Sequence, residues 1–474
     1  MTDDKRPALL WFRQDLRLAD HAALHAAVRS GRAVLAVYVL DDAAAGDWAA
    51  GGASRWWLHH SLAALARDLA AAGAPLVLRR GNSAAVLAAL AQEIGAAEGY
   101  CGAAVEPWAR ALELRVRDAL AADGVTLRRF RTGVLFDPDS IRTQACGVYG
   151  VYTPFSRACF AAGAPNVVSA PRRVLSVAAP RSDHLADWGL LPGKPDWAGG
   201  LRESWQPGAA GAQAALRRFL DGALARYAAR RDFPGEVGTS RLSPHLHFGE
   251  ISAGQVWRAV QAMADGADAE KFLKEVLWRE FAQYLLWHHP ALPEAPLRAE
   301  FARMPWRDDA AALRAWQRGR TGVPIVDAGM RELWQTGWMH NRVRMVVASF
   351  LVKHLLIDWR AGARWFWDTL VDADLGSNAA SWQWVAGCGA DAAPYFRVFN
   401  PVLQGKKFDP DGAYVRRFVP ELRRLGATHI HAPWGVQGDV LAAAGVVLGR
   451  DYPAPIVGLA AGRERALAAF GGLG

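Results

Sequence analysis

The sequence contains few cysteines for its length. Four occur in 474 residues, and none of them belongs to a CxxC pair. A structural zinc site usually needs closely spaced cysteine or histidine ligands, and a disulfide-stabilised secreted domain needs more cysteines. We therefore predict no metal site and no disulfide framework, and we expect a reducing compartment.

Long apolar runs are also missing. No stretch approaches the roughly 20 apolar residues that span a bilayer, and the N-terminal MTDDKRPALLWF lacks the apolar core of a signal peptide. We therefore expect a cytoplasmic protein without membrane contact. The turn after the first apolar run reads RQDLRLAD and has no GxGxxG. A dinucleotide fingerprint is thus absent where it would stand, so a flavin or nicotinamide would have to bind elsewhere.

What the sequence does contain is positive charge and tryptophan. The net charge is +9 and the pI is about 9.6, which favours a polyanionic partner. Twenty-one tryptophans stand against nine tyrosines, an unusual ratio. A hydrophobic content of 52% with 21% charged residues is typical of a globular protein, and the length suggests about two or three domains.

The apolar pattern divides the chain into an α/β part and a helical part. In residues 1–131, helical stretches such as 56–71 and 83–94 separate short apolar runs at 8–12, 33–40, 75–79, 97–101 and 125–130. This alternation predicts a doubly wound, Rossmann-like parallel sheet. Residues 132–211 are rich in Pro, Gly and Ser and are interpreted as an extended interdomain connection.

The remaining residues, 212–474, have helical spacing and no strand signal, which predicts an all-α domain. The expected helices cover 253–263, 267–288, 326–335, 340–357 and 377–385.

The most unusual stretch of the helical part runs from Trp367 to Pro401. Two carboxylates, Asp372 and Asp374, precede a plausible helix start, and Asn378 and Trp382 then share one face at i and i+4. A core helix would be apolar on one face and would not combine acids, an amide and tryptophans. The pattern indicates a site for a flat, polar-edged ligand, although Trp382 and the following Trp384 could simply be core aromatics.

A second polar stretch lies earlier, in YAARRDFPGEVGTSRLSP. Thr239, Ser240 and Ser243 are hydroxyls beside Gly238 and ahead of an expected helix. Hydroxyls and exposed amides at such a place suit an anion such as a pyrophosphate. The alternative is an ordinary capped helix.

Basic residues and aromatics alternate in three further places. The helix containing KFLKEVLWREF would place Glu275, Trp278 and Arg279 on one face, WMHNRVRM supplies two arginines, and QGKK follows a proline turn. Each could be solvated surface, but together they describe a positive surface with aromatics, which suits nucleic-acid binding by base stacking. Trp306 and Trp359 have no spacing argument and are interpreted from the residues alone as core.

The strings WFRQDLRLAD, TSRLSP, FLKEVLWREF, TGWMHNRVRM, DADLGSNAASWQW and DAAPYFRVFNP together resemble the photolyase/cryptochrome family, most closely its bacterial cyclobutane pyrimidine dimer photolyases. The resemblance spans nearly the whole chain. It implies an N-terminal antenna domain and a C-terminal domain that binds folded FAD. It also implies light-driven repair of cyclobutane pyrimidine dimers, in which photoexcited reduced FAD passes an electron to a dimer flipped out of damaged DNA.

The resemblance also assigns residues. The expected FAD contacts are Tyr227, Thr239, Ser240, Arg241, Leu242, Ser243, Asp372, Ala373, Asp374 and Asn378, with Asn378 facing flavin N5. The expected electron chain to the flavin is Trp382, Trp359 and Trp306. The expected dimer and DNA contacts are Arg231, Glu275, Trp278, Arg279, Asn341, Arg342, Arg344, Met345, Trp384 and Gln404, and Glu275 and Asn378 are taken as catalytic.

Two positions depart from the family pattern. His21 stands where the first motif usually has Asn, and an Asn–Glu pair that grips a folate antenna in some relatives is replaced around Trp108–Ala109. Because another folate-binding branch lacks that pair, methenyltetrahydrofolate is still favoured over a deazaflavin as antenna. We expect a monomer.

Three other functions stay open. Repair of (6-4) photoproducts is disfavoured because His340 stands alone and out of register with the histidine pair that such relatives carry. A blue-light receptor that signals through partners is disfavoured because Asn378 is kept and no long C-terminal extension follows the helical domain. A DNA-binding flavoprotein without repair activity is not excluded by the residues.

Overall fold

Five short strands form one parallel sheet near the start of the chain, in the order β3-β2-β1-β4-β5. They are β1 (Ala8–Phe12), β2 (Val34–Leu40), β3 (Leu76–Arg80), β4 (Glu98–Gly102) and β5 (Thr126–Phe130). Every apolar run predicted as a strand is one, so the doubly wound α/β fold is confirmed. The coordinates are a computed structural model that describes residues 6–163, 166–392 and 396–473.

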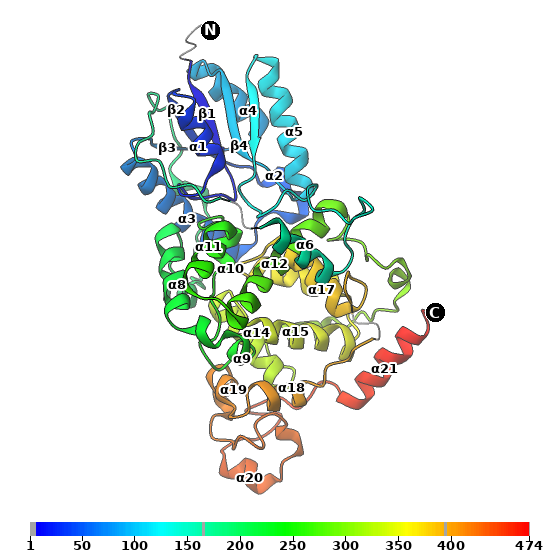
Figure 1. Ribbon diagram of the computed structural model, residues 1–474. Coiled ribbons are helices and arrows are strands. Elements are labelled where there is room, and N and C mark those ends of the chain that lie inside the picture. Colours follow the sequence, from blue (N-terminus) through cyan, green and yellow to red (C-terminus); the bar gives the residue numbers. More distant parts are fainter. Residues whose placement is uncertain (1–5, 164–165, 393–395, 474) are drawn as a thin grey trace.

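Helices cover both faces of this sheet (Figure 1). They are α1 (Ala22–Arg29), α2 (Asp42–Ala45), η1 (Gly46–Trp48), α3 (Gly52–Ala71), α4 (Ser83–Ile94) and α5 (Pro107–Ala122). On β1, Leu10 and Phe12 pack with α1 and α3, whereas Leu9 and Trp11 pack with α4 and α5. Burial on both faces explains why the strands are continuous apolar runs rather than alternating ones.

The rest of the chain is helical, as predicted. The longer helices are α8 (Ala209–Asp221), α11 (Ala253–Met263), α12 (Ala267–His288), α13 (Ala310–Gln317), α14 (Pro324–Thr336), α15 (Asn341–Ser349), α16 (Trp359–Thr369), α17 (Leu375–Ala386), α18 (Pro401–Phe408) and α21 (Leu459–Gly471). Shorter ones are η3 (Ala223–Arg226), α9 (Tyr227–Arg230), α10 (Ser243–His247), η4 (Ala299–Arg303), α19 (Ala413–Phe418), η6 (Pro420–Leu422), η7 (Pro433–Gly435) and α20 (Gly438–Ala443).

Two local predictions need correction. The helix expected over 340–357 is confirmed from Asn341 to His354, but its last turn, η5 (Phe350–His354), is π-helical. The segment interpreted as an extended connection contains an eleven-residue helix, α6 (Tyr152–Ala162), besides η2 (Leu185–Trp188) and α7 (Gly199–Ser204). The domain boundaries at 131 and 211 stay predictions.

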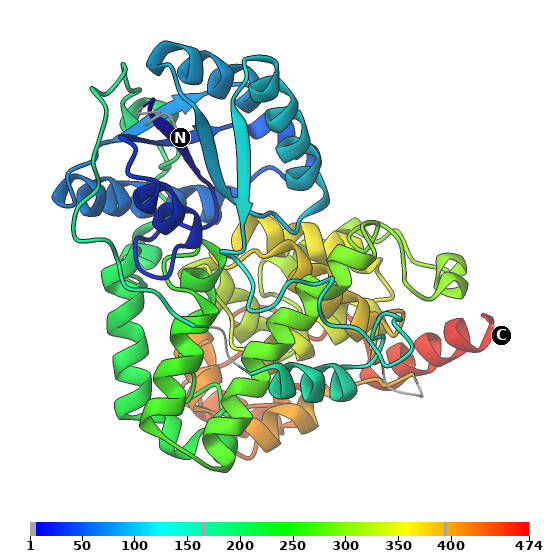
Figure 2. The ribbon, with the colours of Figure 1, turned by 45° about the horizontal axis from the view of Figure 1, so that its top comes forward.

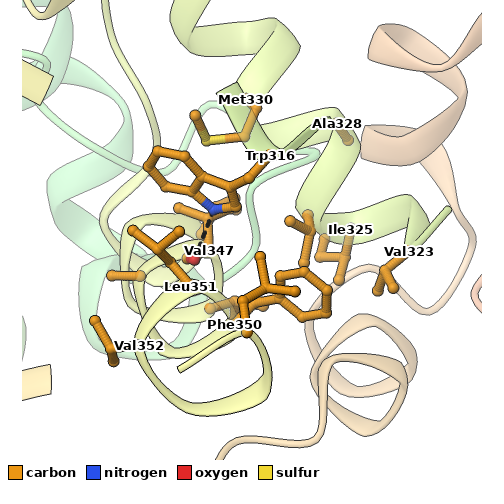
Figure 3. Packing of buried hydrophobic residues seen from close by; sticks show 14 of the residues in the cluster. Trp316, Val323, Ile325, Ala328, Met330, Val347, Phe350, Leu351 and Val352 are labelled. Carbon is orange, nitrogen blue, oxygen red and sulfur yellow. Dashed lines mark hydrogen bonds between the residues drawn. The ribbon is translucent and has the colours of Figure 1, made fainter. Parts of the chain in front are cut away.

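The helical part has an extensive apolar core. Trp316 is completely buried there, and its indole N–H donates to the carbonyl of Val347 at 3.0 Å (Figure 3). Its ring lies 6.1 Å from Phe366 and 6.2 Å from Trp382. This core therefore supports the stretch that sequence analysis singled out, because Trp382 belongs to it.

The motif that follows β1 joins the two parts of the protein. The buried guanidinium of Arg17 donates to the carbonyls of Gly249 at 3.0 Å and Thr132 at 2.8 Å. The backbone N–H of Leu16 donates to the carbonyl of Phe248 at 3.1 Å. Charge-assisted bonds of this kind are expensive to lose once buried, so the motif fixes the sheet against the helices.

No described helix combines the length and the hydropathy that a bilayer crossing requires. The described residues likewise contain no group of three or more His, Cys, Asp or Glu side chains that could hold a metal ion.

Gly249 offers a test of this junction. Its φ is +68°, and a Cβ atom there would overlap the backbone carbonyl oxygen of Gln14. Gly31 has a similar φ of +72° with open space around it, so it is a matched control. We expect Gly31→Ala to lower the free energy of unfolding by about 1–2 kcal/mol through backbone strain. Gly249→Ala should cost a further ~1–3 kcal/mol in thermal or denaturant melting, because overpacking adds to the strain; equal losses would contradict this account.

Candidate functional site

The acidic pair lies between α16 and α17. Asp374 is the N-cap of α17, where its Oδ1 accepts the backbone N–H of Ser377 at 2.7 Å. Its Oδ2 accepts from Gln283 on α12 at 2.6 Å and lies 4.0 Å from Nδ1 of His247. The helix therefore begins at Leu375, two residues before the expected start, and one carboxylate joins α12 to α17.

Asp372 is paired with Arg344. The Nη2 of Arg344 donates to both carboxylate oxygens, at 2.8 and 3.1 Å, and its Nε donates to the carbonyl of Met339. Asp372 is buried, so the pair holds a charged edge at the base of the site. Arg344, expected to contact DNA, is thus directed toward the predicted cofactor residues.

Asn378 lies one turn into α17 and is buried. Its Nδ2 donates to the carbonyl of Ala363 on α16 at 3.0 Å, which fixes the orientation of the amide. No described neighbour donates to its amide oxygen. Trp382, one turn later, packs over Gly362, where a Cβ atom would overlap the indole. The predicted face of Asn378 and Trp382 is therefore held against α16.

The three tryptophans expected to form an electron chain share one core cluster. Trp382 and Trp359 are each 2% exposed, and Trp306 is half-buried against the same cluster. Trp359 is the first residue of α16, and Phe366 of that helix lies 5.1 Å from the Trp382 ring. Trp306 and Trp359, interpreted from the residues alone as core, do contribute to a core, so packing alone explains them. The electron chain stays a prediction.

The hydroxyl-rich turn is a loop that leads into α10. The indole N–H of Trp338 donates to the Ser243 hydroxyl at 3.2 Å. Arg241 has a positive φ of +52°, and its guanidinium lies between the rings of Trp205 and Trp338, at 4.3 and 4.9 Å. Its Nε is buried without a partner in the described chain. Thr239 and Ser240 are half-buried beside it, and the phenol of Tyr227 is buried nearby on α9.

The predicted DNA residues on α12 have different surroundings. Glu275 pairs with Arg231 and lies 3.4 Å from Lys271. Trp278 stacks on Tyr152, with ring centroids 3.7 Å apart and an interplanar angle of 7°. Arg279 donates to the carbonyl of Gly133 and to Glu280, each at 3.0 Å, so it binds the segment that follows β5. It is half-buried like Glu275 and Trp278, with which it shares one face of α12 as predicted.

The arginine at the start of α15 is also engaged. Arg342 donates to Asp232 at 2.8 Å, and its guanidinium lies 4.4 Å from the centre of the Phe408 ring. Asn341 is exposed beside it, and Met345 is half-buried. His340 is the N-cap of α15, accepting from the backbone N–H of Arg342, and burial lowers its pKa to about 4. A neutral capping role therefore accounts for this histidine.

Two further residues were expected to contact the dimer or the DNA, Trp384 and Gln404. Trp384 is half-buried on α17, and its indole N–H donates to the carbonyl of Asp391 at 3.1 Å. Gln404 is half-buried on α18, next to the exposed side chains of Lys406 and Lys407. The quoted motif that ends at Pro401 includes residues 393–395, which lie outside the described residues.

A cavity of about 190 Å³ lies where the sheet meets the helices. It opens at the carboxyl ends of β1 and β4, the point where the strand order reverses, which is the usual ligand site of such sheets. Its walls include Trp48, Trp108, Asp374 and the buried Glu106. Burial, with Asp374 nearby, raises the pKa of Glu106 to about 7, and its Oε2 has no partner in the described chain.

Sequence reasoning missed this cavity. Trp108 stands out in the sequence only as a departure from the family pattern, and Glu106, Gln14 and Trp48 belong to no motif. The available signal was the position of Gln14 and Glu106 soon after apolar runs predicted as strands of one parallel sheet, since parallel strands end at one edge of the sheet.

Family models match most of the chain. Residues 8–172 match the model described as DNA photolyase, and residues 272–472 match the FAD binding domain of DNA photolyase. A deoxyribodipyrimidine photo-lyase of Agrobacterium fabrum is 50% identical over 469 residues, which cover 98% of this chain and 97% of the relative. Cryptochrome-1 of Arabidopsis thaliana is 38% identical over 473 residues, 97% of this chain and 69% of the relative.

Solved structures of photolyases and cryptochromes also match this fold. That of a bacterial class III photolyase from Agrobacterium tumefaciens has a TM-score of 0.95 at 49% identity and covers 100% of this chain and 98% of that one. A Synechocystis cryptochrome has a TM-score of 0.90 at 30% identity, covering 98% and 99%. The chain belongs to the photolyase/cryptochrome family, and its enzyme class is that of the deoxyribodipyrimidine photo-lyases, the DNA photolyases. The resemblance noted from the sequence is confirmed.

The residues present fit the FAD that this family binds. One buried guanidinium nitrogen, Nε of Arg241, has no partner in the described chain, and an unpartnered cationic donor suits the phosphates of a dinucleotide. The fixed amide of Asn378 and the Arg344–Asp372 pair supply polar groups, and a flavin ring has hydrogen-bonding atoms along its edge that could pair with them. The helical part is accordingly an FAD-binding domain.

The raised pKa of Glu106 predicts a pH effect on stability. Since its pKa in the folded protein, about 7, exceeds the ordinary value of 4.5, the folded state holds the extra proton. The contribution of this group to the free energy of unfolding is fully present below pH 4.5 and is lost as the pH rises through 7. Because glutamine cannot ionise, the variant should not lose this stability. We therefore expect the free energy of unfolding of Glu106→Gln, relative to that of the wild type, to be higher at pH 8 than at pH 5 by up to about 3 kcal/mol. Melting curves of both proteins at both values test this, and an equal difference at the two values would contradict it.

Proposed function

We propose that the protein repairs cyclobutane pyrimidine dimers in DNA by light-driven electron transfer from reduced FAD to a dimer flipped out of the duplex. The observation that supports the proposal most strongly is the set of residues that α17 and its neighbour α12 carry. From its cap to its end, α17 carries Asp374, Asn378, Trp382 and Trp384, and it is fixed to α12, which carries Trp278. Residues suited to a cofactor and residues suited to a base are thus held in one rigid pair of helices.

The residues that would hold FAD divide by chemistry. Arg241 and the hydroxyls of the turn before α10 would bind the phosphates. Asn378 would present its amide to N5, and Arg344, neutralised by Asp372, would lie beside the ring. When bound and reduced, FAD absorbs near-ultraviolet or blue light and supplies the electron. No net oxidation follows, since the electron returns after the cyclobutane bonds break.

The residues on the DNA side would lower the cost of extruding the dimer. Flipping a damaged, poorly stacked pair costs a few kcal/mol, and photolyases are among the standard examples of base flipping. Stacking on Trp278 and Trp384, at roughly 1–3 kcal/mol per base, would offset that cost. Glu275 would accept a hydrogen bond from a pyrimidine edge. Arg231, Arg342 and the lysines of α18 would face the phosphates.

We further infer that the cavity between sheet and helices binds the antenna, and that methenyltetrahydrofolate fits it better than a deazaflavin. A pterin edge presents adjacent N–H donors, which one buried carboxylate such as Glu106 accepts together. A deazaflavin edge places carbonyl oxygens on both sides of its N–H, and these would repel that carboxylate. Trp48 and Trp108 supply aromatic walls. Glu106→Ala should therefore release folate, measured by its absorbance, while FAD stays bound.

The repair proposal is tested by illumination. Purified protein, chemically reduced, is mixed with an oligonucleotide that contains one thymine dimer and is exposed to blue light. Restored thymine, measured by chromatography, is expected only in the light. A cryptochrome-like receptor or a DNA-binding flavoprotein would leave the dimer intact in both samples, and that result would overturn the proposal.

Trp382 separates photoreduction from repair. Trp382→Phe keeps an aromatic ring above Gly362 but removes the easily oxidised indole. We expect light to fail to reduce oxidised FAD in this variant, while repair by chemically reduced protein continues at the wild-type rate. Absorbance of the flavin and the oligonucleotide assay measure the two steps. Loss of repair after chemical reduction would place Trp382 in the substrate site or in folding instead.

Trp278 and Arg342 separate base recognition from phosphate binding. Trp278→Ala should weaken binding of dimer-containing duplex by roughly 1–3 kcal/mol and leave undamaged duplex nearly unchanged, because only a flipped base stacks. Arg342→Ala should weaken both about equally and reduce the log–log salt slope by ~0.9, the value for one phosphate contact. Titrations with both duplexes at several salt concentrations measure this.

A melting curve of each variant is the control. If Trp278 were a core residue alone, its truncation would cost about 3–5 kcal/mol of stability and change the two affinities together. That outcome would remove Trp278 from the dimer site.

A further inference from the structure

The segment between the two domains contributes a helix to the DNA-binding part. Helix α6 lies beside α12, as Figures 1 and 2 both show. Its first residue, Tyr152, covers one face of Trp278 in the parallel stack described above. Only the other face of that indole is then available to a base.

Tyr152 is itself held at both ends. Its phenol donates a hydrogen bond to the carbonyl of Lys274, one turn before Trp278 on α12. Its backbone N–H lies close enough to the carboxylate of Asp391 to oppose the rise that burial causes in the pKa of that group. The N-cap residue of α6, Val151, has no side-chain oxygen to offer, so the Asp391 carboxylate is the acceptor that lies near the start of this helix.

Asp391 also contacts Trp384, the second tryptophan of the proposed dimer site. Its carbonyl oxygen accepts the indole N–H of Trp384 at 3.1 Å. Its backbone has a positive φ of +53°, a conformation that non-glycine residues adopt at a cost and that persists only where surrounding contacts hold it. One continuous set of contacts thus runs from Trp278 through Tyr152 and Asp391 to Trp384.

We propose that Tyr152 and Asp391 are positioning residues that hold Trp278 and Trp384 in place as the two aromatic walls of the dimer pocket. The inference rests on the proposed function, since it gives that pocket its framework. An indole held in one orientation before binding loses less conformational freedom when a base arrives, so the framework favours the flipped dimer. Phosphate contacts do not depend on it.

The test uses the full-length, FAD-loaded protein and titrations of dimer-containing and undamaged duplex. Tyr152→Leu keeps apolar bulk but removes the stack, and Asp391→Ala removes the acceptor oxygen near the start of α6 and is compared with Asp391→Asn, which keeps one. We expect Tyr152→Leu and Asp391→Ala each to weaken binding of damaged duplex about three- to tenfold, with undamaged duplex unchanged. Tyr152→Phe and Asp391→Asn should stay within about twofold of wild type, because the stack and an acceptor oxygen persist.

A second arm separates positioning from general stability. In a Trp278→Ala background, Tyr152→Leu should have no further effect on damaged-duplex binding, because no indole is left to position. A merely structural role would lower both affinities, or would add to the Trp278→Ala loss, and either result overturns the inference. A wild-type protein without preference for damaged duplex would instead overturn the proposed function, and a preference that survives Tyr152→Leu unchanged would overturn this inference alone.

Discussion

One carboxylate joins the two helices on which the site is built. Asp374 uses one oxygen to cap α17 and the other to bind Gln283 on α12. Helix N-caps and buried charge-assisted bonds are each worth about 1–3 kcal/mol. Because both are made by the same side chain, the start of α17 cannot shift without losing its contact with α12. The spacing between Asn378 on one helix and Trp278 on the other therefore follows from this residue.

Around that frame, acidic residues hold the cations that the proposed function needs. Glu275 pairs with Arg231, Asp232 with Arg342, and Asp372 with Arg344. The Arg342–Asp232 pair is partly exposed, so a DNA phosphate could compete for this arginine with little desolvation cost. The side chain of Arg231 is only 11% exposed and the carboxylate of Asp372 is buried, so the other two pairs are more expensive to break. The pairing thus leaves one partly exposed arginine that could exchange partners and fixes Arg344 beside the proposed cofactor site.

The fold was predictable where the signal is local. Each strand lies within one residue of its apolar run, because β1 to β4 are largely buried, whereas β5 at the edge of the sheet is mostly exposed. Helices α11 and α12 match their expected bounds. Helix α6 was missed because Val151, its N-cap residue, has no polar side chain and gives no start signal. The end of α15 at Ser349 and the π turn after it have no local cause that we can identify.

For the candidate site, the sequence predicted which residues to examine better than it predicted the contacts that their side chains make. The polar residues at and before the start of α17 indicated from the sequence pattern that Asp372, Asp374 and Asn378 belong to a ligand site. Their assignment to a flavin came from the family resemblance. Which residues each side chain contacts depends on long-range packing. The contact of Arg279 with the carbonyl of Gly133 cannot be inferred from helical spacing. Glu106 becomes noticeable only when strands that are distant in sequence end at one edge of the sheet.

The central claim is that tryptophans on two different helices form one pocket. A double-mutant cycle tests it most directly: Trp278→Ala, Trp384→Ala and the double variant, each titrated with dimer-containing duplex. If both rings hold the same flipped dimer, losing the first should remove most of the benefit of the second, so the free-energy losses should fall short of additivity by about 0.5–3 kcal/mol. Strict additivity would show that the two tryptophans act independently and would contradict the account.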